Sequence, residues 1–253
     1  MALTSPHFHW DSREVEMTYV PESADEIVAI GRRMVGEALG VLGFTFVAGS
    51  AIVVNGITNG GLGLLGMGAA IAIAYVVMLS VFYPISGGHI NPGVTVGMVA
   101  ARRMPPSIGL LYIGAQFGGA ILGALLLNVI YNDFVSDAAS SASLAFGSKM
   151  GGWTGGFFEA ILTFVLVTVY FRAFVDARGD KTMGAFAVGM VALFGFLVAF
   201  PLTGAAMNLA RVFGTDLVGG QWSDFGYYWL GLIGGGAAGL LYEYIFATPE
   251  AEA

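Results

Sequence analysis

Two asparagines in similar surroundings are the residues of this sequence best suited to handle a small polar molecule. Asn91 lies in SGGHINPGVTVG and Asn208 in TGAAMNLARVFG. An asparagine can cap a helix with its side-chain oxygen while its amide group stays free to donate to a passing solute. Two short helices meeting head to head would aim two positive dipole ends at one point, which disfavours cations and protons. One such asparagine could simply cap a buried turn, but two at matching positions favour a pore.

A third residue adds a charge beside this pair. Arg211 follows Asn208 by one helical turn and lies in an otherwise apolar segment. A cation at the centre of a bilayer costs at least about 2.5–3.5 kcal/mol, so we expect Arg211 to face a wet cavity. The alternative is an arginine that extends along the surface to reach the membrane boundary.

The elements that position these residues are predicted to be membrane helices. Hydrophobic residues make up 57% of the 253 residues and charged residues 11%. A helix needs about 20 apolar residues to cross about 30 Å of hydrocarbon. Six runs of this kind predict an all-α membrane protein, with spans at 33–55, 62–84, 107–131, 155–175, 183–202 and 225–247.

The two asparagines lie in apolar stretches that are too short to span. These stretches, 85–99 and 203–213, are predicted to be re-entrant half-helices, which are tolerated at membrane depth only where they line a cavity. A glutamate precedes each asparagine at a comparable distance: Glu37 by 54 residues and Glu159 by 49. Each copy contains three spans, so the two copies must be inverted. Inverted repeats with broken helices indicate a transport protein.

The repeat also divides the chain. We expect a polar, acidic tail at 1–32, a channel domain at 33–247 with halves at about 33–131 and 155–247, and a short tail at 248–253. Eight of the ten basic residues fall on one side of the predicted spans. The positive-inside rule makes that side cytoplasmic, so we expect a multi-pass protein of the plasma or inner membrane with both termini in the cytoplasm. The beginning of the sequence has no basic and apolar pattern of a cleaved signal peptide.

ISGGHINPG at 85–93 and PLTGAAMNLAR at 201–211 resemble the two Asn-Pro-Ala loops of the aquaporin, or major intrinsic protein, family. The resemblance covers about 33–247. It implies a homotetramer of passive channels for water in which Glu37 and Glu159 hold the loop backbones and Arg211 forms an outer constriction. By family spacing, the other constriction residues would be Ile71, Phe196 and Ala205.

The sequence departs from the family pattern at the motifs themselves. Pro92 keeps the first proline, but Gly93 replaces alanine, and Leu209 replaces the second proline and so removes its fixed φ. Phe196 matches neither the histidine usual in water channels nor the glycine usual in glycerol facilitators. Val212, in place of an aspartate, favours water; a facilitator of glycerol, other small neutral solutes or gases is the alternative within this fold.

Other classes of function have less support. Ser86 and His89 lack the third group that a hydrolase would need, so we predict no enzyme, and His89 is expected either to make a structural hydrogen bond or to line the inner vestibule. An ion-coupled transporter would need carboxylates near the midplane, and we place both Glu37 and Glu159 near cytoplasmic helix ends. There is no cysteine, and His7 and His9 lack further ligands, so no metal or cofactor is expected. The charge distribution gives no support for nucleic-acid binding.

Overall fold

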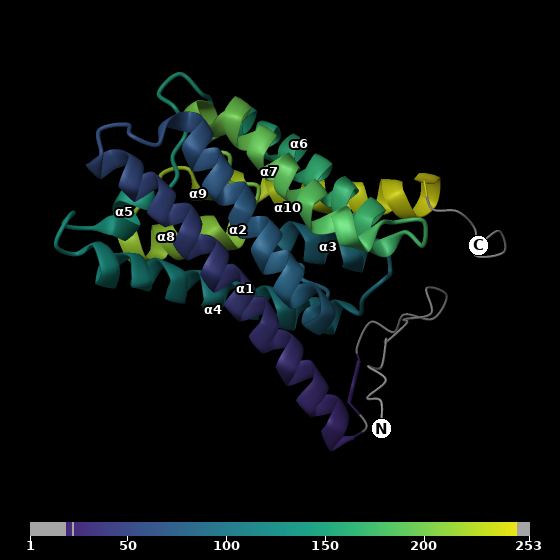
Figure 1. The fold of residues 1–253 in the computed structure, drawn as a ribbon. Helices are drawn as coiled ribbons and strands as arrows, with labels where there is room; N and C mark the ends of the chain where they lie inside the picture. The colour runs from purple at the N-terminus through teal and green to yellow at the C-terminus, as the bar shows by residue number, and fades with distance from the viewer. Residues whose placement is uncertain (1–18, 22, 247–253) are drawn as a thin grey trace.

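The computed structural model describes residues 19–21 and 23–246, and within them every regular element is a helix (Figure 1). Most of the predicted tail at 1–32, including His7 and His9, and the tail at 248–253 lie outside the described residues.

Within the described residues, the six predicted spans are confirmed as six apolar helices long enough to cross a membrane. They are α1 (Ala24–Ile57), α2 (Gly63–Ser86), α4 (Pro106–Tyr131), α6 (Gly152–Tyr170) with the π-helix η1 (Phe171–Val175), α7 (Lys181–Thr203), and a last span made of α9 (Phe225–Tyr228), α10 (Leu230–Leu241) and η2 (Tyr242–Phe246). The first span begins earlier than predicted because Ser23 caps α1 by accepting a hydrogen bond from the Glu26 amide. As Figure 1 shows, this end of α1 projects beyond the helix bundle.

A short helix begins in each predicted re-entrant stretch. These helices are α3 (Pro92–Ala100) and α8 (Leu209–Gly219), which lie toward opposite ends of the bundle (Figure 1). The spans before them end in the same way, at Gly87 with φ 88° and at Gly204 with φ 77°. Glycine suits these positions because the left-handed region is strained for other residues. Another short helix, α5 (Ala138–Ala142), lies in the connection between the two halves.

The halves of the molecule repeat each other in their packing. A Cβ atom on Gly119 of α4 would lie 2.0 Å from the Ala38 carbonyl oxygen, and one on Gly234 of α10 would lie 2.0 Å from that of Ala160. Ala38 follows Glu37 and Ala160 follows Glu159. Thus α1 packs on α4 as α6 packs on α10, and glycine is required at the closest approach of each pair.

One predicted placement is wrong. Three spans, α1, α2 and α4, cross the membrane before α6, so α6 begins on the face opposite to the one where α1 begins. Glu37 lies in the first half of α1 and Glu159 in the first half of α6, so the two carboxyl groups cannot both lie near cytoplasmic helix ends. Glu159 belongs to the opposite half of the membrane from Glu37, as the inversion of the repeat requires.

Candidate functional site: the centre and outer end of the pore

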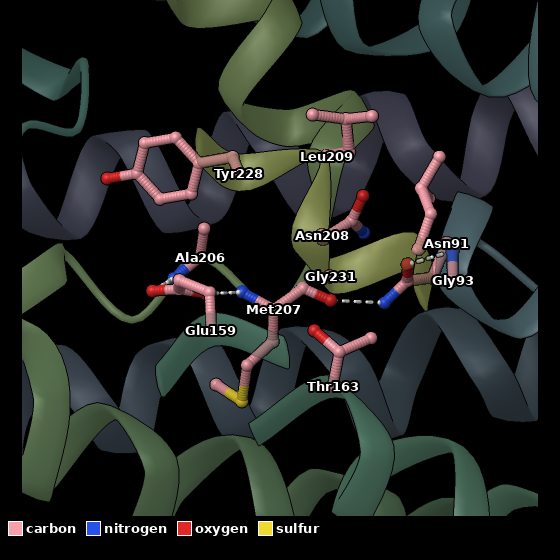
Figure 2. Close-up of a pocket in the computed structure, with 11 residues that line it drawn as sticks. Asn91, Gly93, Glu159, Thr163, Ala206, Met207, Asn208, Leu209, Tyr228 and Gly231 are labelled. Atoms are coloured by element: carbon pink, nitrogen blue, oxygen red, sulfur yellow. Dashed lines mark hydrogen bonds between the residues drawn. The ribbon is translucent and has the colours of Figure 1, made fainter. Parts of the chain in front are cut away.

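The two asparagines hold the half-helices together at the centre of the molecule. The side-chain oxygen of Asn91 accepts from the Gly93 amide at 2.8 Å, and that of Asn208 accepts from Ala210 at 3.1 Å. Each side-chain amide then crosses to the other repeat: Asn91 Nδ2 donates to the Met207 carbonyl at 2.7 Å and Asn208 Nδ2 to the Ile90 carbonyl at 2.8 Å (Figure 2 shows the first). Each asparagine thus caps its own helix and binds the loop of the opposite half.

The amide of Asn91 is not free for a solute, contrary to our expectation. Its nitrogen also donates to the hydroxyl of Tyr75 at 3.0 Å, so both N–H groups have acceptors within the protein. Tyr75 lies on α2 one helical turn after Ile71, and both side chains are buried. We did not single out Tyr75 from the sequence, although its spacing from Ile71 is the signal that could have found it.

Glu37 organises the first loop. Its Oε1 accepts from the Ser86 hydroxyl at 2.6 Å and the His89 amide at 2.9 Å. Its Oε2 accepts from the Ile90 amide at 2.7 Å and from Gln116 Nε2 at 2.7 Å. Four donors surround this buried carboxyl group and fix the backbone that leads into Asn91.

Glu159 organises the second loop with one donor fewer. Its Oε1 accepts from the Thr203 hydroxyl at 2.5 Å and the Ala206 amide at 3.0 Å, and its Oε2 accepts from the Met207 amide at 2.8 Å. Figure 2 shows the two backbone bonds. Thr203 occupies the place that Ser86 has in the first half.

His89 is enclosed by protein. Its Nδ1 pairs with Thr95 Oγ1 at 3.0 Å, and its ring packs near those of Tyr112 and Tyr170, with centroids 4.9 and 5.9 Å away. The side chain is buried, so of the two roles considered, the geometry fits the structural hydrogen bond better than a lining of the inner vestibule.

The helix starts differ at the proline position. Pro92 is the first residue of α3 and Leu209 the first residue of α8, and both are buried. The Leu209 side chain packs in a small apolar cluster with Leu144, Val212 and Tyr228. Asn208, in front of it, has extended backbone with φ −150° and ψ 100°.

The four residues expected at the outer constriction are all buried. Ile71, Phe196 and Ala205 belong to one apolar cluster. Arg211 is 1% exposed, yet within the described residues none of its three guanidinium nitrogens has a hydrogen-bond partner. Glu159 and Asp216 are the carboxyl groups that act on it electrostatically. A buried guanidinium group without acceptors is a set of donors available to a bound molecule.

Known proteins agree with this architecture. The profile of the major intrinsic protein family matches residues 26–242. Aquaporin TIP4-4 of Zea mays is 39% identical over 215 residues, covering 81% of this chain and 84% of that protein. Aquaporin-4 of Bos taurus is 37% identical over 177 residues, covering 69% and 54%. The aquaglyceroporin structure from Plasmodium falciparum superposes with a TM-score of 0.72 at 21% identity, covering 85% of this chain and 96% of that one.

Six spans and two half-helices joined through paired asparagines define a membrane protein of the channel class. The chain belongs to the major intrinsic protein family.

Proposed function

We propose that this protein is a passive channel whose main permeant is water and which excludes ions and protons. The observation that carries the proposal is Arg211, a buried guanidinium group whose nitrogens lack protein acceptors. A structural arginine in an apolar interior would be expected to have hydrogen-bonded partners, because an unpaired buried charge is costly. A wet pore beside Arg211 supplies acceptors in the form of water.

Electrostatics support the exclusion of cations. The amino ends of α3 and α8 meet at the asparagine pair, so their positive dipole ends lie together. Arg211 adds a full positive charge one turn into α8. A hydrated cation or a proton approaching from the Arg211 side would meet both, whereas a neutral molecule would meet only hydrogen-bonding groups.

The carboxyl groups argue against ion-coupled transport. Glu37 accepts four hydrogen bonds and Glu159 three, and four of these seven bonds come from backbone amides of the loops they support. A coupling site needs a carboxylate that can exchange protein donors for an ion, and these two are committed to backbone. The same reasoning leaves no group for catalysis at the pore centre, so we propose a channel and no enzymatic activity.

Water is favoured over glycerol by the shape of the constriction. Phe196 is a large ring with no exposed surface, and Ile71 is also large and apolar. A pore lined by Phe196, Ile71 and Arg211 offers little room for a carbon chain. A glycerol or small-solute facilitator is the alternative in the same fold.

We further propose a homotetramer in a cell membrane with cytoplasmic termini. A Cβ atom on Gly114 or Gly118 of α4 would meet no atom within 4 Å, so this helix face is open to a neighbouring subunit or to lipid. Native mass spectrometry of the purified protein tests the assembly; a monomer in gentle detergent and in nanodiscs would contradict it.

A panel of osmotic shocks tests the substrate. Purified protein in liposomes is mixed with impermeant solute, glycerol, urea or ammonium salts, and light scattering follows the volume. Water flux well above that of protein-free vesicles, with glycerol flux at their level, is expected. Glycerol flux as fast as water flux would favour the facilitator instead.

A further inference from the structure

Tyr75 lies where a permeating molecule would have to bind. Its hydroxyl is 3.0 Å from Asn91 Nδ2, and the Asn208 side chain interacts with it electrostatically. Its ring packs against Phe44 with centroids 4.4 Å apart, and the whole residue is 2% exposed. A tyrosine hydroxyl accepts and donates hydrogen bonds much as a water molecule does.

Because both N–H groups of the Asn91 side chain already have acceptors, a solute and the Tyr75 hydroxyl compete for the same position. One N–H is held by the backbone carbonyl of Met207, which the loop fixes, and the other is held by Tyr75. A solute oxygen can reach an Asn91 donor only if one of the two moves. The tyrosine side chain is the movable one, because it can rotate about χ1 and χ2 without breaking the backbone.

We propose that Tyr75 occupies the solute position at the asparagine pair and thereby limits both the flux and the size of the permeant. This inference rests on the proposed channel function. Permeation requires the hydroxyl to leave Asn91 and the ring to move out of the path of the solute, so the resting pore is closed at its centre. Ile71, Phe196 and Arg211, at 2%, 0% and 1% exposed, are also closely surrounded in this closed state, so the wet pore beside Arg211 belongs to the open state.

Two substitutions separate the hydroxyl from the ring. Tyr75→Phe frees one Asn91 N–H but keeps the bulk, and Tyr75→Val removes both. Water permeability per folded protein should rise about fivefold in Tyr75→Phe, the factor that corresponds to one neutral hydrogen bond. It should rise further in Tyr75→Val, which should also pass glycerol. Val77→Ala, on the exposed face of the same helix, is the control and should match the wild type.

The outcomes distinguish this proposal from the channel function itself. If the wild type conducts water and Tyr75→Val conducts it at the same rate, the role of Tyr75 is overturned but the channel function is not. No flux above protein-free vesicles in either protein, with both folded, would overturn both proposals. Higher flux and a wider solute range in Tyr75→Val would support both.

A second observation concerns the missing donor at Glu159. Because Gly119 and Gly234 occupy equivalent places in the repeat, the residues three positions before them, Gln116 and Gly231, are equivalent too. Gln116 gives Glu37 its fourth hydrogen bond at 2.7 Å. Gly231 has no side chain to do the same for Glu159.

A cavity of about 10 Å³ lies at this place, lined by Glu159, Thr163 and Gly231 among others (Figure 2). Thr163 is 2% exposed, and its hydroxyl has no partner in the described part of the protein. Such a volume is close to the lower limit for one water molecule, and a polar lining is what a buried water requires. The cavity therefore has both the size and the unmet hydrogen bonds of a water site.

We infer that one buried water replaces the Gln116 amide in the second half, donating to Glu159 and pairing with the Thr163 hydroxyl. Thr45 provides a matched comparison, because its hydroxyl is also buried without a partner but does not line this cavity. Thr45→Val removes an unsatisfied group and should leave the melting temperature unchanged or raise it. Thr163→Val removes a partner of the water and should lower it by about 2–4 °C.

A rise in melting temperature for Thr163→Val, like that of Thr45→Val, would show that the cavity is dry. A high-resolution structure of the wild type gives the independent readout. Density for one water within hydrogen-bonding distance of both Glu159 and Thr163 is expected, and an empty cavity would overturn the inference even if Thr163→Val failed to fold.

Discussion

At the scale of single residues, the polar groups divide into those that build the pore and those left over for a permeant. Four side chains form hydrogen bonds with the loop backbone: Asn91, Asn208, Glu37 and Glu159. The guanidinium group of Arg211 forms none within the described residues. This division explains how a rigid centre and an available donor set coexist in one site.

Replacing Arg211 with valine tests this division directly. No protein hydrogen bond is lost, so Arg211→Val should fold and melt within a few degrees of the wild type, whereas breaking a paired buried charge typically costs about 3–5 kcal/mol. Selectivity should change: cations or larger neutral solutes should pass more readily. Thermal unfolding and solute flux in liposomes measure the two effects. Unchanged selectivity in folded protein would contradict the placement of Arg211 at the constriction.

The sequence allowed the residues with distinctive spacing to be predicted, but not the contacts between halves. The asparagine and glutamate pairs follow from the repeat. Tyr75 was missed because a tyrosine in an apolar span resembles any core residue until Asn91 is brought beside it across the bundle. The prediction for Glu159 was also wrong. It placed Glu159 near the same membrane face as Glu37, although the inversion of the repeat puts the two glutamates in opposite halves of the membrane.

At the scale of elements, α8 shows why its proline can be absent. Leu209 is the first residue of the helix, where an N–H has no intrahelical partner, and Asn208 before it has the extended backbone that a following proline requires. Proline and leucine are therefore both compatible with this helix start. The Asn208 cap, which accepts from Ala210 and Arg211, fixes the helix in either case.

Leu209→Pro should accordingly be tolerated. Proline gains about 0.4–1 kcal/mol from the restricted unfolded chain, and the smaller side chain loses roughly 0.8 kcal/mol of apolar burial. Unfolding free energy should stay within about 1 kcal/mol of the wild type. Val212→Pro is the control: the Val212 amide donates to the Asn208 carbonyl at 3.3 Å, and losing this bond should cost about 3 kcal/mol. Equal losses in both variants would show that α8 has no proline-compatible start.

The C-terminal ends of the fourth and sixth spans are joined by Asp176. Its carboxyl group accepts from Arg178 Nε at 2.9 Å and from the Tyr242 hydroxyl at 2.5 Å. The Arg178 guanidinium group, hydrogen-bonded to the carboxylate, holds the pKa of Asp176 well below its usual value. Because the pKa of Asp176 is lower in the folded protein than in the unfolded chain, its ionised form stabilises the fold. This stabilisation is complete above the pKa of the unfolded chain and is lost as the pH falls through the pKa of the folded protein.

Asp176→Asn should therefore lower the melting temperature at neutral pH, and the difference from the wild type should shrink as the pH falls below about 4. The change in melting temperature should be only a few degrees, because the Arg178 side chain is exposed and solvent weakens its ion pair with Asp176. Asp180→Asn is the control, because asparagine can still cap α7 through the Thr182 amide. A difference that persists unchanged into strong acid would mean that the ionised carboxylate is not the stabilising form.

At the scale of the whole molecule, the inverted repeat was predictable because it depends on span number and motif spacing, both of which are properties of the sequence alone. The difference between the two halves in the interior could not be predicted in this way. Gln116 and Gly231 occupy equivalent places yet fill them differently, and this is visible only once α4 and α10 are superimposed by their packing on α1 and α6. Symmetry sets the architecture, and the departures from it distinguish the two halves of the pore.

The absence of cysteine is a further property of the whole chain with a functional consequence. Mercurials act on thiolates, and the sequence offers none. Flux should persist after treatment with mercuric chloride at concentrations that leave the protein folded. A single cysteine introduced at Ala205, at the proposed constriction, should make the flux sensitive to mercury and reversible by thiol. Rapid block of the unmodified protein would reveal a different ligand near the pore.

The most direct test of passive conduction is the temperature dependence of water flux in liposomes. Stopped-flow light scattering after an osmotic step gives the permeability of vesicles that contain the wild type, Tyr75→Val or no protein. We predict an activation energy for both proteins well below that of protein-free vesicles, with no dependence on sodium or on a proton gradient. An activation energy equal to that of the lipid alone in both proteins, or flux that requires a counter-ion, would contradict a passive channel.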